Sequence, residues 1–133
     1  MISRFIDEDV FKYIENFSSE RENFKELVDY AESNRVPIVS QDVARFIELL
    51  LKIIKPKNIL EIGSAIGYSS LIMYKASDAN ILTIEKDEET FKVLKENLKK
   101  YDEDNKIKAI NDDAINALKS MDKEEKFDFC FID

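Results

Sequence analysis

Residues 58–70, with the sequence NILEIGSAIGYSS, constrain the fold of this chain more than any other stretch. They begin as a short apolar run, turn at Gly63 and reach Gly67, where a helical pattern starts. The chain has only two glycines, so both are expected where the backbone turns tightly or approaches something closely. A strand that ends in a glycine turn and leads into a helix is typical of the ligand-binding end of doubly wound α/β folds.

The spacing of apolar residues predicts strands and helices in alternation after residue 57. Four short apolar runs are typical of strands buried in a parallel sheet, and the segments between them have helical spacing. Right-handed crossovers between such strands place helices on both faces of the sheet. We therefore predict an α/β protein with a Rossmann-like, doubly wound parallel sheet, with strands at 58–62, 80–84, 106–110 and 127–132 and helices at 68–75, 88–100 and 114–121.

Three helices are predicted before the first strand. One covers residues 7–17, with one apolar face made of Val10, Tyr13, Ile14 and Phe17. The second follows a capping box formed by Ser19 and Glu22, and the third begins at Ser40 and ends near residue 54. The second is expected to bury Phe24, Leu27, Val28 and Ala31, and the third to turn inward Val43, Phe46, Ile47, Leu50, Leu51 and Ile54. We divide the chain into a helical cap, residues 1–36, and an α/β domain, residues 37–133. The cap can serve as a peripheral cover, a dimer contact or a substrate lid.

Composition excludes several classes of site. Histidine is absent, which excludes Ser-His-Asp and Cys-His nucleophilic sites and His-ligated zinc within this chain. The net charge of −8 argues against nucleic-acid binding through the bulk field, although it allows a local basic face. The single cysteine, Cys130, lies in an apolar run and is expected to be buried. No apolar run is long enough for a bilayer and no signal peptide is visible, so we expect a cytoplasmic protein without a membrane partner.

Acidic residues follow the predicted strands, at the edge where open α/β sheets bind ligands. Glu85 follows the second strand about 20 residues after the glycine turn, where a carboxylate can accept hydrogen bonds from a ribose diol. Asp113 follows the third strand and can accept from an adenine amine, or merely cap the next helix. Ser69 lies at a helix start that favours anions, or is an ordinary first-turn serine. No Lys-Ser/Thr pair follows the glycines, which excludes a P-loop. A nucleoside with a carboxylate tail, such as S-adenosylmethionine (SAM), fits this pattern.

Residues 61–69, EIGSAIGYS, resemble motif I of the class I SAM-dependent O-methyltransferases of the catechol and caffeoyl-CoA type. Within that group they are most similar to the bacterial branch that includes tRNA 5-hydroxyuridine methyltransferases. Residues 37–50 resemble the helix before motif I, and residues 127–133 resemble the Phe-Asp-x-x-Phe-Ile-Asp motif of the family. Asp112-Asp113-Ala114 resembles its Gly-Asp-Ala motif, with Asp112 in place of the glycine.

The resemblance implies a SAM site and part of a magnesium site. The residues implied for the cofactor are Val39, Glu61, Gly63, Ser64, Gly67, Tyr68, Ser69, Glu85, Asp113, Ala114 and Asp133. Asp133 would also be a catalytic residue and a Mg²⁺ ligand. Family members carry their other metal ligands further along the chain, and one carboxylate with waters should bind Mg²⁺ poorly. We therefore expect a fragment of a longer protein, with little methyl transfer by these 133 residues alone. The alternative is a minimal domain that covers its open sheet edge by dimerising.

Three functions remain open at this point. The first is an O-methyltransferase that acts on 5-hydroxyuridine in tRNA through a metal-bound hydroxyl. The second is an O-methyltransferase for small catechol-like or caffeoyl-CoA-like molecules. The third is a non-catalytic module that binds SAM or a partner. The resemblance also implies a homodimer.

Overall fold

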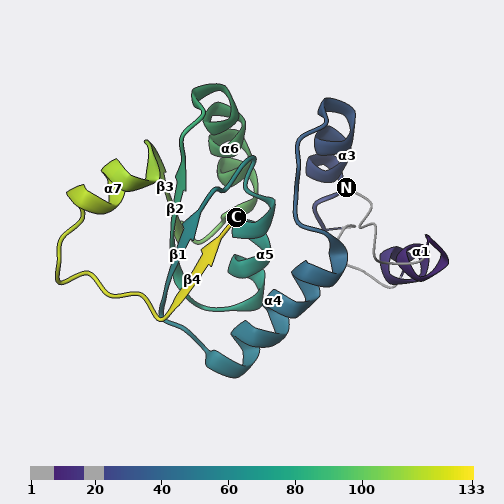
Figure 1. Ribbon diagram of the computed structural model, residues 1–133, viewed down its shortest axis with the longest axis horizontal. Coiled ribbons are helices and arrows are strands. Elements are labelled where there is room, and N and C mark those ends of the chain that lie inside the picture. The colour runs from purple at the N-terminus through teal and green to yellow at the C-terminus, as the bar shows by residue number, and fades with distance from the viewer. Residues whose placement is uncertain (1–7, 17–22) are drawn as a thin grey trace.

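The chain folds into a parallel sheet with helices on both faces (Figure 1). The computed structural model describes residues 8–16 and 23–133. The elements are α1 (Glu8–Asn16), α3 (Lys25–Asn34), α4 (Gln41–Ile54), β1 (Asn58–Ile62), α5 (Tyr68–Ala76), β2 (Asn80–Glu85), α6 (Glu88–Tyr101), β3 (Ile107–Asn111), α7 (Ala114–Ser120) and β4 (Phe129–Ile132). Each strand and each helix predicted after residue 57 is present, with ends that differ from the prediction by at most two residues.

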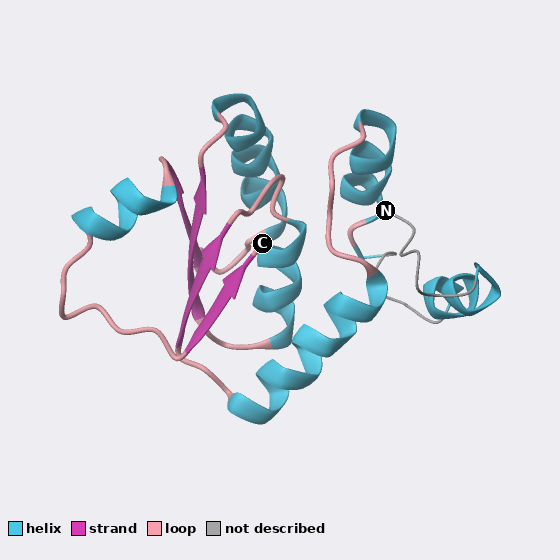
Figure 2. Ribbon diagram, in the orientation of Figure 1, coloured by secondary structure: helices cyan, strands magenta, loops and turns pink. Residues whose placement is uncertain are grey.

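The sheet has the order β3-β2-β1-β4, and all three strand pairs are parallel. Helices α4, α5 and α6 lie on one side of it and α7 lies on the other (Figure 2). In register, Leu60 of β1 pairs with Leu82 of β2 and with Cys130 of β4. This arrangement confirms the predicted doubly wound α/β fold. It also places β4 at one edge of the sheet.

Alternation along the strands divides the core into two layers, because neighbouring side chains point to opposite faces. Ile59 and Ile81 belong to the larger cluster, which also contains buried residues of α3, α4, α5 and α6. Leu60 and Leu82 belong to a smaller cluster with Ala117 of α7. The strands are apolar on both faces because helices cover both, as expected for a parallel sheet.

The N-terminal helices agree with the prediction in part. Helix α3 buries the expected Phe24, Leu27, Val28 and Ala31, and Arg35 ends it in the left-handed conformation. The described part of α1 turns Val10 and Tyr13 outward, with exposed fractions of 50% and 66%. Phe17, the side chain of Ile14 and the capping box of Ser19 and Glu22 lie outside the described residues.

The predicted inner face of α4 is wrong in part. Ile47 and Leu51 are buried as expected, but Val43, Phe46 and Ile54 are exposed and Leu50 is half-buried. The buried face is instead made of Gln41, Ala44, Ile47, Glu48 and Leu51. The physical reason is that α4 packs against α5 through one side of a wide apolar arc; α1 also contacts α4, but these apolar side chains stay exposed. Ser40 precedes the helix as predicted, but its hydroxyl bonds the Asp42 carboxylate (2.5 Å) and does not cap the helix backbone.

The expectation that Cys130 is buried is also wrong. The thiol is exposed, because β4 is an edge strand of the described sheet and no helix within residues 8–16 and 23–133 covers Cys130. Ile132, two residues further along the same face, is 71% exposed.

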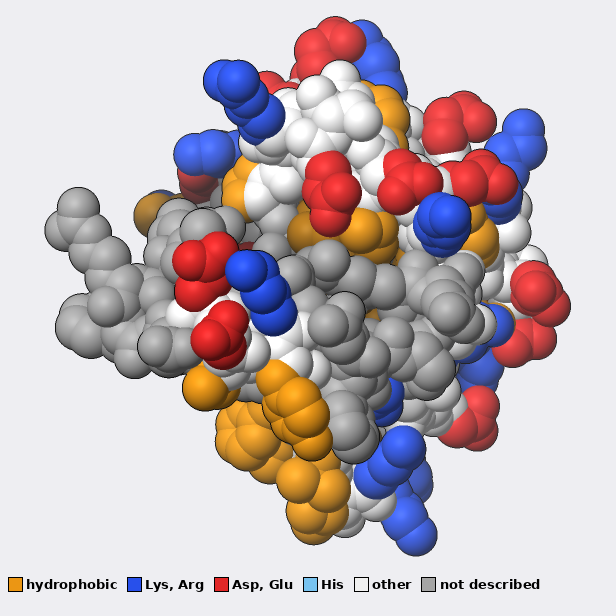
Figure 3. All heavy atoms as spheres, turned by 90° about the vertical axis from the view of Figure 1, so that its right-hand side faces the viewer, with side chains coloured by type: hydrophobic (Ala, Val, Ile, Leu, Met, Phe, Trp, Pro, Cys, Tyr) orange, Lys and Arg blue, Asp and Glu red, His pale blue; other side chains and the backbone are white. Residues whose placement is uncertain are grey.

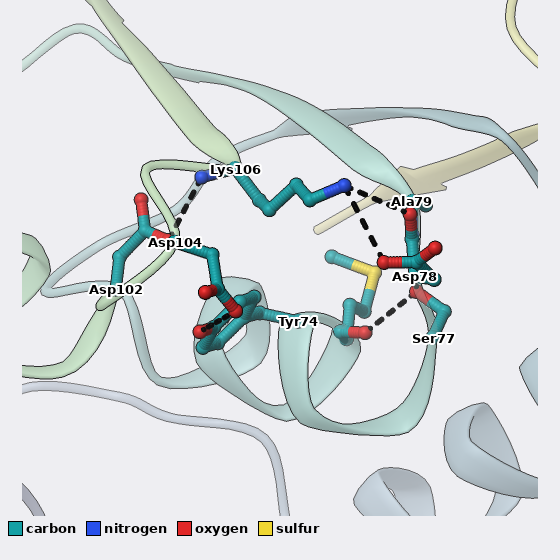
Figure 4. A network of polar contacts seen from close by, with 8 residues as sticks. Tyr74, Ser77, Asp78, Ala79, Asp102, Asp104 and Lys106 are labelled. Atoms are coloured by element: carbon teal, nitrogen blue, oxygen red, sulfur yellow. Dashed lines mark hydrogen bonds and ion pairs between the residues drawn. The ribbon is translucent and has the colours of Figure 1, made fainter.

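Polar contacts hold together the loops at the amino ends of β2 and β3 (Figure 4). The Tyr74 hydroxyl donates to the Asp104 carboxylate (2.8 Å), and burial together with this carboxylate raises the pKa of Tyr74. Asp102 accepts hydrogen bonds from the backbone N–H groups of Lys106 and Ile107, both at 2.9 Å. The Lys106 ammonium lies 3.4 Å from the Asp78 carboxylate. These contacts fix the end of the sheet that lies away from the ligand-binding edge.

Candidate functional site

A cavity of about 390 Å³ lies at the carboxyl ends of the strands, where the topology predicts ligand binding. Its walls come from all four strand ends and from the start of α7. The lining residues are Ile62, Gly63, Ile84, Glu85, Lys86, Asp112, Asp113, Ala114 and Asp133. Four acidic residues and one lysine are therefore among the residues that line this cavity.

Gly63 forms the floor of the turn because only a glycine fits there. Its φ is +87°, and a Cβ added to it would lie 2.6 Å from the backbone oxygen of Asp133. Its N–H donates to the Ile84 carbonyl (2.9 Å), so the turn is fixed to the end of β2. Gly67 has φ +93°, and a Cβ there would lie 2.6 Å from Cδ1 of Leu94. The two glycines thus serve close packing at the site, as the sequence predicted.

A buried carboxylate, Glu61, fixes the start of α5 to the sheet. It is 0% exposed, and it accepts hydrogen bonds from the hydroxyls of Ser69 (2.5 Å), Ser70 and Thr83 (2.6 Å). Burial raises the pKa of Glu61 more than these three hydroxyls lower it, and the charge of Asp133 raises it further. We name Glu61, Ser69, Ser70 and Thr83 the Glu61 cluster.

Glu85 connects the end of β2 to the glycine turn. One carboxylate oxygen accepts from the N–H of Ala65 (2.9 Å) and the other from the N–H of Asp87 (2.8 Å). Each oxygen retains a second lone pair, so the carboxylate can still accept from a ligand in the cavity. Glu85 is 9% exposed, and it lines the cavity. The structure therefore places it where a ribose diol could reach it.

Asp113 is the N-cap of α7, as one reading of the sequence predicted. Its Oδ1 accepts from the N–H groups of Ile115 (2.9 Å) and Asn116 (3.4 Å). Asp113 and Ala114 line the same cavity. Capping and ligand binding are thus compatible at this residue.

Four lining residues were absent from the predicted site: the strand residues Ile62 and Ile84, and the charged residues Lys86 and Asp112. Asp112 accepts from the N–H of Asp113 (2.7 Å), and Lys86 is exposed at the rim. The sequence could have indicated Asp112 and Lys86, because they are adjacent to Asp113 and Glu85. Residues next to an acidic residue at a strand end lie at the same edge of the sheet.

The predicted residues divide into two groups. Gly63, Glu85, Asp113, Ala114 and Asp133 line the cavity. Val39, Glu61, Ser64, Gly67, Tyr68 and Ser69 do not line it.

Members of the second group have identifiable places in the packing. The Tyr68 ring packs edge-on against Phe24, with centroids 6.3 Å apart, and the Ser69 hydroxyl bonds Glu61. Val39 packs on the larger core cluster. The Ser64 hydroxyl is enclosed and has no hydrogen-bond partner among the described residues. Any role of these residues toward a cofactor stays a prediction.

The described residues do not form a magnesium site. Among them, no group of three or more His, Cys, Asp or Glu side chains is arranged to hold a metal ion. Mg²⁺ requires near-octahedral oxygen ligation, which the Asp133 carboxylate cannot supply by itself. Asp133 as one metal ligand therefore stays a prediction, and no chemical step below depends on the metal.

Comparison with known proteins identifies the family. The family model described as O-methyltransferase matches residues 14–133. The chain belongs to this O-methyltransferase family. It is 34% identical over 125 residues to the caffeoyl-CoA O-methyltransferase of Medicago sativa, covering 88% of this chain and 51% of the relative. It is 31% identical over 99 residues to the catechol O-methyltransferase of Niastella koreensis, covering 71% of this chain and 45% of the relative.

A solved structure has the same fold. The O-methyltransferase from Bacillus cereus in complex with SAH, the demethylated product of SAM, superposes with a TM-score of 0.82 at 26% identity. The match covers 94% of this chain and 60% of that one. The chain spans about half the length of the curated relatives it matches. No helix among the described residues is long and apolar enough to cross a membrane.

Proposed function

We propose that this chain forms the cofactor-binding part of a SAM-dependent O-methyltransferase whose acceptor is a hydroxyl of a small catechol-like or caffeoyl-CoA-like molecule. The observation that carries the proposal is the cavity at the strand ends, where Gly63, Glu85 and Asp113 lie together. Family membership supports the reaction class, and the SAH bound to the Bacillus cereus relative supports the cofactor.

The residues around the cavity suit an adenosine with a charged tail. Glu85 would accept from the ribose hydroxyls, and Asp113 would accept from the adenine amine. The first turn of α5 presents backbone N–H groups that lack partners within the helix, which favours the carboxylate of the tail. The Glu61 cluster holds that turn in place. The chain's own groups therefore bind and orient the cofactor, while the cofactor supplies an electrophilic methyl group.

In the proposed reaction, the bond between the sulfonium sulfur and the methyl carbon breaks as the acceptor oxygen bonds the methyl carbon. The acceptor hydroxyl loses its proton to solvent, and the sulfonium becomes a neutral thioether. Asp133 lies exposed at the rim of the cavity, where it can orient the acceptor hydroxyl. Enzymes of this kind gain most of their rate from positioning the two reactants.

Two observations favour a small acceptor. Relatives found by comparison are a caffeoyl-CoA and a catechol O-methyltransferase. The chain carries a net charge of −8, which opposes association with tRNA through the bulk field. The tRNA acceptor predicted from motif I stays a prediction without further support. The homodimer and the cytoplasmic location also remain proposals.

Calorimetric titration of the 133-residue chain with SAH tests the cofactor site. We expect saturable binding that weakens about tenfold or more in Glu85→Gln and in Asp113→Asn, since each loses a charge-assisted hydrogen bond. Asp78→Asn is the matched control, because it removes one carboxylate at the opposite end of the sheet. Absence of SAH binding by a chain with native circular dichroism would refute the proposal.

Transfer of tritium from labelled SAM tests the acceptor. Catechol, caffeoyl-CoA and tRNA are offered in parallel, and product is counted over hours because we expect slow turnover by this chain. Label on catechol or caffeoyl-CoA supports the proposal, and label on tRNA alone replaces it with the tRNA function. SAH binding without label on any acceptor supports the cofactor site and is the result expected of these 133 residues alone, so it does not favour the non-catalytic module.

A further inference from the structure

One side chain, Asn111, fastens the turn between β2 and α6 to the end of β3. Asn111 is the last residue of β3 and pairs in register with Glu85, the last residue of β2. Its Nδ2 donates hydrogen bonds to the backbone carbonyl of Glu85 (2.8 Å) and to that of Lys86 (3.3 Å). The amide carries two hydrogens, so it can serve both carbonyls at once. We name these two contacts the Asn111 clamp.

The clamp sets the direction of the peptide unit between Lys86 and Asp87. This peptide is planar and trans, so its carbonyl and its N–H point in opposite directions. Because the Lys86 carbonyl faces Asn111, the Asp87 N–H points away from Asn111. It points toward the Glu85 side chain and donates to Oε1 of that carboxylate at 2.8 Å. The hydrogen bond on one side of the peptide therefore fixes the donor on its other side.

Backbone donors hold both oxygens of the Glu85 carboxylate. The Asp87 N–H bonds Oε1, and the N–H of Ala65 in the glycine turn bonds Oε2 at 2.9 Å. A rotated Lys86–Asp87 peptide would withdraw the first donor and turn a carbonyl oxygen toward the carboxylate, which repels it. The lone pairs of Glu85 that are left for a ligand in the cavity therefore keep their direction only while this peptide keeps its own.

We propose that Asn111 is a positioning residue: through the Lys86–Asp87 peptide it sets the direction of the Glu85 carboxylate, the group assigned above to the cofactor ribose. The identity of that ligand rests on the proposed function, whereas the geometry rests on the hydrogen bonds of the clamp. Asn111 is exposed and does not line the cavity, so it acts through Glu85 and not by contact with a ligand. The amide is essential to this role, because the carboxylate of Asn111→Asp would set negative oxygens against two carbonyls.

Amide hydrogen exchange followed by nuclear magnetic resonance tests the clamp without a ligand. In Asn111→Ala and Asn111→Asp the Asp87 N–H should exchange about threefold or more faster than in the parent chain, because its peptide unit has lost the bond to residue 111. The Thr90 N–H is the internal reference. It donates to the Asp87 carboxylate (2.7 Å) at the start of α6, and its exchange should stay the same.

Asn34→Ala is the matched control for both variants. It also removes a hydrogen bond from an asparagine Nδ2 to a backbone carbonyl, that of Tyr30 (2.9 Å). Helix α3, which carries both residues, lies on the side of the molecule that Figure 3 shows, whereas β3 and α7 lie on the opposite side in Figure 1. Circular dichroism and the urea midpoint check that all variants fold.

Calorimetric titration with SAH then tests the role toward the cofactor. Asn111→Ala should raise the SAH dissociation constant about threefold to tenfold, and Asn34→Ala should leave it unchanged. Glu85→Gln removes the charge through which Asn111 is proposed to act. Asn111→Ala added to Glu85→Gln should therefore raise the dissociation constant by less than about twofold further, a non-additivity that a merely structural role would not produce.

The outcomes separate this inference from the proposed function. Absence of SAH binding by the folded parent chain refutes the proposed function, and the exchange of the Asp87 N–H then decides alone whether Asn111 sets the peptide. Unchanged exchange in both Asn111 variants overturns the inference. An unchanged SAH dissociation constant in Asn111→Ala, or a full additive loss when it is combined with Glu85→Gln, also overturns it, because a residue that acts through Glu85 has little effect once that charge is gone.

Discussion

Replacement of Glu61 tests whether its buried carboxylate holds the cofactor turn. Glu61→Ala leaves the hydroxyls of Ser69, Ser70 and Thr83 without their acceptor inside the core. At about 1 kcal/mol for each lost hydrogen bond, the expected destabilisation is about 3 kcal/mol. That is a large part of the 5–15 kcal/mol typical of whole domains. Glu61→Gln keeps the shape and lets the amide bond all three hydroxyls, so we expect stability within about 1 kcal/mol of the parent chain.

The pH dependence separates the charge of Glu61 from its hydrogen bonds. Burial raises the pKa of Glu61 above its ordinary value of 4.5, so the folded chain holds a proton that the unfolded chain has released. Between 4.5 and the raised pKa, the unfolded state binds fewer protons, and stability therefore falls as pH rises. The charge of Asp133 acts in the same direction. The Glu61→Gln variant has no ionisable side chain at this position, so its free energy of unfolding should fall less between pH 4.5 and the raised pKa.

Urea unfolding at pH 5, 6 and 7, followed by circular dichroism, measures both effects. We expect the free energy of unfolding of the parent chain to fall as pH rises, and that of Glu61→Gln to fall less. We expect Glu61→Ala to unfold at a lower urea concentration than the parent chain at every pH. Equal slopes for the parent and Glu61→Gln would show that Glu61 is not the titrating group. An Ala variant as stable as the parent would refute the structural role of the Glu61 cluster.

Three further changes probe the turn and the sheet. Gly63→Ala should lower the free energy of unfolding by at least about 1–2 kcal/mol and weaken SAH binding, because the added Cβ meets the rigid backbone of Asp133. Thermal unfolding measures the first effect and calorimetry the second. Gly67→Ala should lower the free energy of unfolding by less, because the added Cβ meets only the flexible end of the Leu94 side chain. An equal destabilisation by Gly67→Ala and Gly63→Ala would contradict this reasoning. Asp128→Asn should destabilise the chain more at pH 7 than in acid. Two backbone N–H groups at the start of β1 lower the pKa of Asp128 below its ordinary value of 3.8, so its contribution is present above 3.8 and is lost as pH falls through the lowered pKa; unfolding across a series of acid pH values checks the sign.

The order of the elements could be read from the sequence because it depends on local patterns. The apolar runs that became β1 and β2 are short, buried on both faces and bounded by turn residues, so their period and length identify them. Gly63 and Glu85 could be placed at one edge for the same reason, since the carboxyl ends of parallel strands meet there. The cavity confirms that placement.

Side-chain directions at the site could not be read in the same way. Tyr68 and Ser69 begin α5 as predicted, but the Tyr68 ring turns toward Phe24, which lies 44 positions earlier. The Ser69 hydroxyl turns toward Glu61, whose burial depends on strands on either side of it. Such contacts depend on which distant segments pack together. Sequence spacing predicts which residues lie at the turn, but the direction of each side chain depends on tertiary packing.

The error in α4 has a different origin. Helical periodicity identifies the apolar face of a helix, but it does not show which of those side chains are buried by the rest of the chain. The predicted inner face joined Ile47 and Leu51 with Phe46 and Ile54, and the chain itself buries only the first two. Cys130 was misplaced for the same reason, because its strand has the composition of an interior strand but lies at the edge. In both errors, side chains that were predicted to be buried are exposed. Periodicity and strand composition therefore predict that a side chain is covered, and only the three-dimensional arrangement shows which positions the described elements cover.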